Sequence, residues 1–218
     1  MTIYLFPGQG ADKRIFGSLQ FDPSWRIKHI EYKTPAKGMS LAAFSKEIAG
    51  EIDTCEKFIL IGVSLGGIIC AELAEILNPE KVIIISSAKN SKELPFRYRF
   101  QKIIPLYKLL PPVVFLAGAK FLQPIVEPDR NKHKATFKSM LDKKVPLYMK
   151  RTIDMIINWE RTSNIKKIIH VHGDNDHTLP INKIKVDYIV KNGSHMMTLT
   201  RAREINVILK SIIQESSE

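Results

Sequence analysis

The segment Gly62-Val63-Ser64-Leu65-Gly66-Gly67 constrains the fold of this chain more than any other part of the sequence. It is preceded by Phe58–Val63, a continuously apolar run rich in β-branched residues, which is typical of a parallel strand covered on both faces. It is followed by Gly66–Leu77, which is apolar on nearly every side and predicts a deeply packed helix with Glu72 and Glu75 as its polar edge. The chain is therefore expected to pass from a buried strand into a buried helix through a very tight turn.

Apolar runs elsewhere in the chain predict further strands, which together with this one are expected to form a sheet of about six strands. The expected strands are Ile3–Phe6, Ile27–Tyr32, Phe58–Val63, Val82–Ile85, Ile168–His172 and Val186–Val190. Helical patterns separate them, including one capped by Ser40 and a last one near the C-terminus with Ile205, Ile208, Leu209 and Ile212 on one face. This alternation predicts an α/β fold with a mostly parallel sheet flanked by helices, in one domain that spans residues 1–218.

Residues 91–163 interrupt this alternation. No strand-like run of comparable quality occurs there, and helical patterns are punctuated by prolines from Pro95 to Pro146. Because so long a loop is uncommon between strands of a compact domain, the segment is expected to be a helical insertion. Its apolar run Leu109–Ala119 is too short to span a bilayer, and no transmembrane segment is expected anywhere in the chain.

The formal net charge of +11 is concentrated in the same part of the chain. Between Lys89 and Lys167 there are 18 lysines and arginines against six acidic residues, whereas the rest of the chain has 15 against 16. Such an excess attracts an anionic substrate or an anionic surface, or it forms only a solvated face. No motif of a nucleic-acid-binding module accompanies the charge, so no nucleic-acid partner is expected.

Two features favour a cytoplasmic location. The N-terminal residues Met1–Pro7 lack the basic region and the cleavage site of a signal peptide, and their pattern is that of a strand. The chain has only two cysteines, Cys55 and Cys70, which are expected to be reduced thiols. The sequence leaves the oligomeric state open.

Ser64 is the candidate nucleophile, because a G-x-S-x-G sequence between a strand and a helix is the arrangement of a nucleophile elbow. A serine hydroxyl needs a base, and the base needs a carboxylate to orient it. His195 is the candidate base, since it follows the last expected strand and precedes the final helix. Asp174 and Asp176 both follow the strand Ile168–His172 and are the candidate acids. This order of serine, acid and histidine is that of α/β-hydrolases.

Three motifs together resemble the α/β-hydrolase superfamily, in its cap-bearing branch of esterases and lipase-like enzymes. They are Gly62-Val63-Ser64-Leu65-Gly66, Gly173-x-x-Asp176-x-x-x-Pro180 and Gly193-Ser194-His195, and the resemblance covers nearly the whole chain. The resemblance implies that Asp176, four residues before the proline, is the acid, with Asp174 as the alternative. It also implies that residues 91–163 form the helical cap. One departure from the family is that the sheet is expected to lack the usual N-terminal hairpin.

The first strand ends in Phe6-Pro7-Gly8-Gln9-Gly10, where the family has its oxyanion loop, usually His-Gly-x-Gly. Pro7 stands where histidine is common, and the resemblance assigns the oxyanion-binding N–H groups to Gln9 and Leu65. The implied activity is that of a serine hydrolase resembling carboxylesterases. It would cleave an ester or related acyl bond of a small molecule through an acyl-enzyme on Ser64, and no cofactor or metal is expected.

Three other functions stay open. The glutamine in the loop Phe6–Gly10 also resembles that of acyl-carrier-protein malonyltransferases, which suggests an acyltransferase or a thioesterase that uses the same serine. A metallohydrolase is suggested by His170, His172 and Asp174, together with His177, because alternate strand residues share one face. A non-catalytic ligand-binding protein would keep the same turn for its backbone geometry alone.

Overall fold

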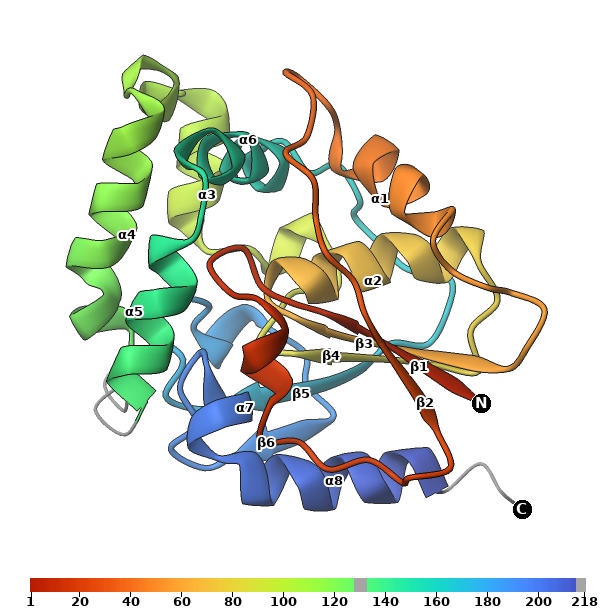
Figure 1. Ribbon diagram of the computed structural model, residues 1–218. Coiled ribbons are helices and arrows are strands. Elements are labelled where there is room, and N and C mark those ends of the chain that lie inside the picture. The colour runs from red at the N-terminus through yellow and green to blue at the C-terminus, as the bar shows by residue number, and fades with distance from the viewer. Residues whose placement is uncertain (128–132, 215–218) are drawn as a thin grey trace.

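The computed structural model describes residues 1–127 and 133–214, and the strands in these residues form one sheet in the order β2-β1-β3-β4-β5-β6 (Figure 1). The strands are β1 (Thr2–Phe6), β2 (Arg26–His29), β3 (Phe58–Val63), β4 (Lys81–Ile85), β5 (Ile169–Gly173) and β6 (Tyr188–Val190). Every neighbouring pair is parallel. The expectation of a mostly parallel sheet of about six strands is therefore confirmed.

The central strands match their predicted ranges more closely than the edge strands do. All six residues of β3 are buried, and its limits are those expected from the apolar run. In contrast, the predicted ranges Ile27–Tyr32 and Val186–Val190 were wrong in extent, since β2 ends at His29 and β6 begins at Tyr188. Each of these strands lies at an edge and pairs with one neighbour only, so the length of that pairing, more than the apolar pattern, sets its limits.

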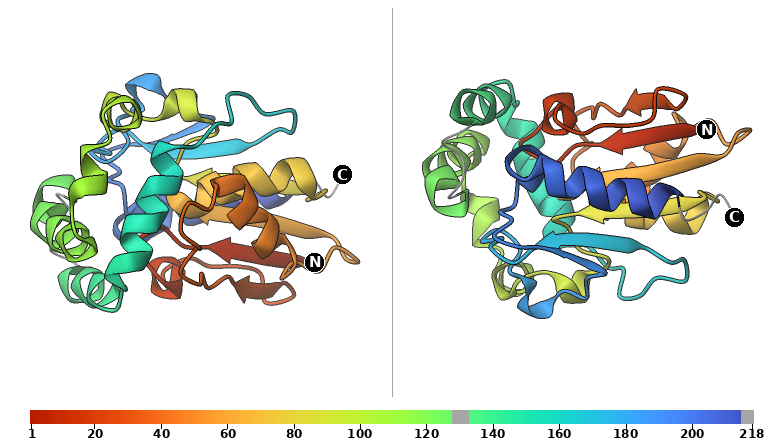
Figure 2. Two further views of the ribbon diagram at one scale, coloured as in Figure 1. Left: turned by 90° about the horizontal axis from the view of Figure 1, so that it is seen from above. Right: turned by 90° about the horizontal axis from the view of Figure 1, so that it is seen from below.

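Helices cover both faces of the sheet, as its apolar strands require (Figure 2). They are η1 (Lys13–Phe16), α1 (Leu41–Ala49), α2 (Leu65–Ile76), α7 (Met197–Thr200) and α8 (Ala202–Gln214), with η5 (Ile181–Lys183) between β5 and β6. Alternate residues of β1 point to opposite faces: Tyr4 packs in the cluster of α1 and α2, and Ile3 in that of η1 and α8. The hydroxyl of Ser40 accepts a hydrogen bond from the N–H of Ala43 at 3.1 Å and caps α1 as predicted.

Residues 91–163, called here the helical segment, lie between β4 and β5. Its described residues contain η2 (Ser91–Glu93), α3 (Phe96–Ile103), η3 (Leu106–Leu109), α4 (Pro112–Val126), α5 (Lys134–Asp142) and α6 (Pro146–Ile157), and no strand. Figures 1 and 2 show these helices grouped at one end of the sheet. Across the described residues, no helix has both the length and the apolar character needed to cross a bilayer.

The polar contacts that hold the helical segment to the sheet layer include those of Gln9 and of Glu72. The amide of Gln9 donates hydrogen bonds to the carbonyl of Met149 at 2.9 Å and to the hydroxyl of Thr152 at 2.7 Å, both in α6. Glu72 of α2 accepts two hydrogen bonds from Arg161, at 2.8 and 2.9 Å, where the segment returns towards β5. Glu72 also accepts one from the indole of Trp159 and is buried, so the prediction that it forms a polar edge of α2 was wrong. A carboxylate inside the layer is acceptable here because a guanidinium pairs with it.

Candidate active site

Ser64 lies at the junction of β3 and α2 in a backbone conformation that side-chain-bearing residues rarely adopt. Its φ is 53° and its ψ is −119°, and strain of this kind is concentrated at functional turns. The turn requires glycine on both sides: a Cβ on Gly62 would lie 2.3 Å from the carbonyl oxygen of Gly66, and one on Gly66 would lie 2.0 Å from that of Phe6. Between residues 58 and 74, Ser64 is the one residue that is not buried. The sharp turn thus lifts its hydroxyl out of the core.

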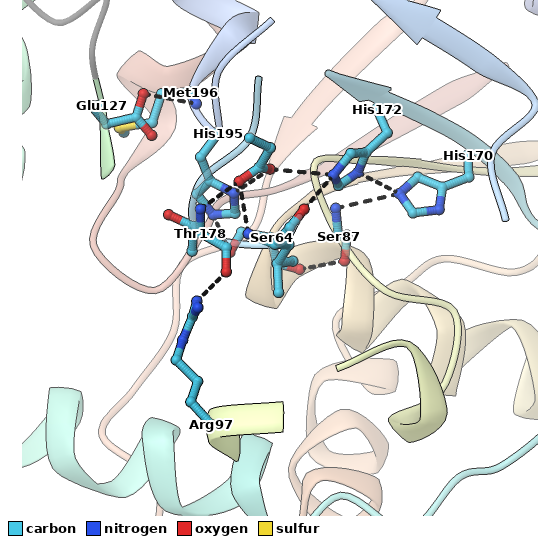
Figure 3. Close-up of polar contacts among 11 residues, drawn as sticks. Ser64, Ser87, Arg97, Glu127, His170, His172, Thr178, His195 and Met196 are labelled. Carbon is cyan, nitrogen blue, oxygen red and sulfur yellow. Dashed lines mark hydrogen bonds and ion pairs between the residues drawn. The ribbon is translucent and has the colours of Figure 1, made fainter. Parts of the chain in front are cut away.

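The structure brings Ser64, His195 and Asp176 into one hydrogen-bonded chain (Figure 3). The Oγ of Ser64 lies 2.9 Å from Nε2 of His195, and Nδ1 of His195 lies 2.8 Å from Oδ2 of Asp176. The three residues follow β3, β6 and β5, respectively, and the carboxyl ends of parallel strands meet at one edge of the sheet. Sheet topology therefore assembles residues that are up to 131 positions apart in the sequence.

Asp176 and Asp174 lie in different environments. Asp176 is buried, and its Oδ1 accepts hydrogen bonds from the N–H groups of Thr178 and Leu179, both at 2.8 Å. These bonds hold the carboxylate so that Oδ2 faces His195. Asp174 is exposed, and it accepts a hydrogen bond at 2.6 Å from the N–H of Asn192 in the loop that leads to His195. Of the two candidate acids, Asp176 is the one that contacts the imidazole.

Asp176 and His195 stabilise each other's charged form. Burial acts to raise the pKa of Asp176, but the nearby His195, with His172 and the backbone N–H of Leu179, outweighs burial and holds this pKa below its usual value. Burial likewise acts to lower the pKa of His195, but the charge and hydrogen bond of Asp176 raise it above the ordinary value. The pair is therefore suited to hold an imidazolium once His195 has taken up a proton.

The loop after β1 lies directly beside the serine. A Cβ on Gly8 would lie 3.3 Å from the Cβ of Ser64, and the hydroxyl of Tyr32 donates a hydrogen bond to the carbonyl of Pro7 at 3.1 Å. Leu65 is the first residue of α2, so its N–H has no acceptor inside that helix. Gly8, which precedes Gln9, and Leu65 therefore both adjoin Ser64, and the assignment of the oxyanion-binding N–H groups to Gln9 and Leu65 stays a prediction. The side chain of Gln9 has a separate contact, since it bonds to α6.

The histidines of β5, His170 and His172, form a buried pair (Figure 3), and Nε2 of His172 lies 3.4 Å from Oδ2 of Asp176. The Nε2 of His172 lies 2.8 Å from the carbonyl oxygen of Leu179 and its Nδ1 lies 3.1 Å from Nε2 of His170. Burial lowers the pKa of both rings. His177 is exposed and contacts Asn175 at 3.0 Å. No three histidine, cysteine, aspartate or glutamate side chains of the described residues are grouped to hold a metal ion.

Two residues of the helical segment reach the site and were not predicted from the sequence. The guanidinium of Arg97 in α3 donates a hydrogen bond to the carbonyl of Thr178, next to Asp176. Glu127, which follows α4, is buried and accepts a hydrogen bond from the N–H of Met196 at 3.3 Å. Burial raises the pKa of Glu127 to about 7. The only sequence signal for Glu127 is that it is one of six acidic residues in a strongly basic region.

No protein-family model matches the chain, and no curated protein matches it either. Several solved structures do match the chain. The chain superposes on the enol-lactonase from Burkholderia xenovorans LB400 with a TM-score of 0.71 and 15% identity, over 100% of this chain and 91% of that one. A thermophilic esterase from Thermogutta terrifontis gives 0.70 and 12%, over 99% and 90%. A lipase-esterase related protein from Clostridium acetobutylicum ATCC 824 gives 0.70 and 15%, over 96% and 93%. At such identities the likeness concerns the fold.

Proposed function

Because the chain has the α/β-hydrolase fold, we propose that it is a serine hydrolase that cleaves an ester or a related acyl bond. The observation that carries the proposal is the hydrogen-bonded chain from Ser64 through His195 to Asp176, with the serine on a strained turn in which it alone is not buried. The names of two structural neighbours, an esterase and an enol-lactonase, support an acyl–oxygen bond as the target.

In the first half of the reaction, the Oγ of Ser64 attacks the acyl carbon of the substrate. Nε2 of His195 takes the hydroxyl proton, and Asp176 stabilises the imidazolium that results. The carbonyl oxygen becomes an oxyanion that accepts hydrogen bonds from the N–H groups of Leu65 and Gln9. Removing one donor of such a pair typically costs about 10²–10³ in rate. His195 then gives its proton to the leaving group, and the acyl group stays on Ser64.

In the second half, water enters in place of the leaving group. His195 takes a proton from this water, which attacks the acyl carbon and forms a second oxyanion at the same position. The bond to Ser64 breaks, His195 returns the proton to Oγ, and the carboxylic acid leaves. The chain's own residues supply the nucleophile, the base, the orienting acid and the oxyanion donors that these steps require.

The helical segment acts in this proposal as the cap over the site. It reaches both catalytic loops, through Arg97 next to Asp176 and through Glu127 next to His195, and so borders the space above Ser64. Its apolar residues suit an apolar acyl chain, and its basic residues suit an anionic substrate.

Covalent labelling tests the proposal most directly. A fluorophosphonate probe should label the wild type and Ser211→Ala, whose serine lies on the exposed side of α8, but not Ser64→Ala. The wild type and Ser211→Ala should also hydrolyse p-nitrophenyl esters, and Ser64→Ala should not. The acyl chain length that is hydrolysed fastest reports the size of the acyl pocket. A folded wild type that is inert to both reagents would indicate a ligand-binding protein. Labelling followed by transfer of the acyl group to an added alcohol or thiol, with little hydrolysis, would indicate an acyltransferase.

A further inference from the structure

Residues 96–121 of the helical segment expose apolar side chains at an unusual density. Ten of the 17 large apolar side chains that are exposed in the described residues lie in these 26 positions. They are Phe96, Phe100, Ile103, Ile104, Leu106, Leu109, Leu110, Val113, Val114 and Phe121. Monomeric proteins rarely leave such a concentration of apolar residues in water, and larger patches mark sites of interaction. These ten residues are called here the exposed apolar face.

Helix α3 has no buried residue at all. Phe96 and Phe100 contact each other with their ring centroids 6.0 Å apart, and Ile103 continues the same side of the helix at i+7 from Phe96. Phe96 is 65% exposed and Ile103 is 79% exposed. A helix whose aromatic and aliphatic stripe faces solvent contributes little to the core, so its sequence is better explained by contact with something outside the chain.

Helix α4 is apolar on two sides, and the protein covers only one of them. Phe115 and Leu116 pack with Tyr148 of α6. On the other side, Val113, Val114 and Phe121 are exposed, although a helix that only covers a core would carry polar residues there.

The same 26 residues carry five cations and no acidic residue. The cations are Arg97, Arg99, Lys102, Lys108 and Lys120. Within the described residues, Lys120 is the one among them with an acidic partner, Asp142 at 2.6 Å. Apolar and aromatic side chains interspersed with unneutralised arginine and lysine are typical of segments that lie in the interface of an anionic membrane.

From this combination we infer that the exposed apolar face binds the surface of an anionic lipid bilayer, with Arg99, Lys102 and Lys108 at the headgroups and the apolar side chains among the upper parts of the acyl chains. A second copy of the chain fits less well, because a two-fold interface would bring the five cations of one copy against the same five of the other. The inference goes beyond the proposed function, since it concerns binding and not turnover. The same helical segment contacts the loops of Asp176 and His195. When the protein is bound to a bilayer, its candidate active site would therefore lie close to the lipid.

Co-sedimentation with vesicles tests this inference independently of catalysis. The full-length Ser64→Ala variant is mixed with vesicles of phosphatidylcholine alone or of phosphatidylcholine with 30% phosphatidylglycerol, so that hydrolysis does not interfere. Binding is expected to the anionic vesicles, to be at least tenfold weaker to the neutral ones, and to fall as salt rises. No binding to anionic vesicles would overturn the inference.

Matched variants identify the surface involved. Phe96→Ser/Ile103→Ser/Leu109→Ser should weaken vesicle binding at least tenfold, whereas Ile165→Ser/Val207→Ser, which replaces exposed apolar residues elsewhere, should leave it unchanged. Arg99→Glu/Lys102→Glu should weaken it by about fivefold or more per charge, and Lys46→Glu/Lys210→Glu by much less. Circular dichroism checks that each variant is folded.

Two results would contradict the assignment of this face to lipid. One is equal loss of binding in the apolar variant and its control. The other is a dimer in light scattering that the Phe96→Ser/Ile103→Ser/Leu109→Ser variant converts to a monomer, which would make the face a protein interface.

Discussion

The edge of the sheet that carries Ser64 and the helical segment beside it use their residues in different ways. At the sheet edge, Asp176 is buried and accepts hydrogen bonds from two backbone N–H groups and from His195, so its position is fixed by several partners at once. In the helical segment, α3 has no buried residue, and α4 leaves one apolar side uncovered. The first arrangement holds the side chains of Ser64, His195 and Asp176 in place, and the second presents a surface.

This difference predicts which substitutions should have large effects on activity or stability. Substitutions at the sheet edge disturb either the reacting groups or backbone atoms that touch one another, so they should cost activity or stability steeply. Substitutions in the exposed parts of the helical segment should leave the fold intact and change which surfaces or molecules the protein binds. For each sensitive position the chain offers a matched one that we expect to tolerate the same change.

The largest effect is expected at the acid. Asp176→Asn should lower kcat/KM by about 10³–10⁴, because an amide stabilises the imidazolium poorly and favours the wrong tautomer of His195. Asp174→Asn should change kcat/KM by less than about tenfold, since an asparagine oxygen can still accept the hydrogen bond from Asn192. Steady-state hydrolysis of the best p-nitrophenyl ester measures both variants. A greater loss in Asp174→Asn would mean that the acid is assigned to the wrong residue.

The next largest effect concerns glycine in the two regions. A Cβ on Gly66 would lie 2.0 Å from the backbone oxygen of Phe6, so Gly66→Ala should lower the free energy of unfolding by about 3 kcal/mol or more. Gly118 lies within α4 with nothing within 4 Å of the corresponding position, so Gly118→Ala should raise the free energy of unfolding by about 0.5–1 kcal/mol. Urea unfolding followed by circular dichroism gives both values. Similar losses in the free energy of unfolding at the two positions would show that α4 is packed as tightly around Gly118 as the turn is around Gly66.

The third prediction concerns the ion pair that joins the two regions. Arg161→Met removes both hydrogen bonds from the guanidinium to Glu72 and leaves a buried carboxylate with the indole of Trp159 as its remaining donor. The free energy of unfolding should fall by about 2 kcal/mol, less than for a fully buried pair because Arg161 is partly exposed. Arg26→Met removes a pair with Glu56 at 3.7 Å between exposed side chains and should cost less than about 0.5 kcal/mol. Equal effects would mean that burial does not strengthen the first pair.

The sequence was sufficient to predict the sheet and to bring Ser64, His195 and two candidate acids to one of its edges, because both depend on local patterns, whereas the choice of Asp176 over Asp174 rested on the resemblance to α/β-hydrolases. Continuous apolar runs identify central parallel strands such as β3, and the carboxyl ends of such strands meet at one edge whatever the loop lengths. Only glycine fits beside so tight a turn, and this made Ser64 stand out among the serines of the chain. The edge strands β2 and β6 were less well predicted, because the partner strand determines where each pairing stops.

The contacts of the helical segment were not predictable in the same way. Whether Glu72 faces water or Arg161 depends on how the segment returns across α2, 89 residues later in the sequence. The positions of Arg97 beside Thr178 and of Glu127 beside Met196 likewise follow from the packing of helices and not from a period in the sequence. The side chain of Gln9 was also missed, because its contacts with Met149 and Thr152 lie about 140 positions away.

The smallest effect is expected from Glu127, where the two regions meet. Burial raises the pKa of Glu127 to about 7, and its charge is one of the influences that raise the pKa of His195, after Asp176. In the proposed mechanism neutral His195 is the base, so kcat/KM should rise with pH through the pKa of His195. Glu127→Gln should move this rise to lower pH by less than one unit. Glu160→Gln, which replaces an exposed carboxylate of the same segment, should not move it.

The same substitution should also change how stability depends on pH, and the sign is fixed by the direction of the shift. The folded state binds the proton of Glu127 more tightly than the unfolded state does, since its pKa is about 7 instead of the ordinary value of 4.5. This stabilisation is complete below pH 4.5 and is lost as pH rises through 7. In Glu127→Gln, urea midpoints measured from pH 4.5 to 8 should therefore fall less with rising pH than in the wild type. A pH profile unchanged in both activity and stability would mean that Glu127 is not buried beside His195 in solution, and that this part of the helical segment is held less closely against the site than the sheet edge is.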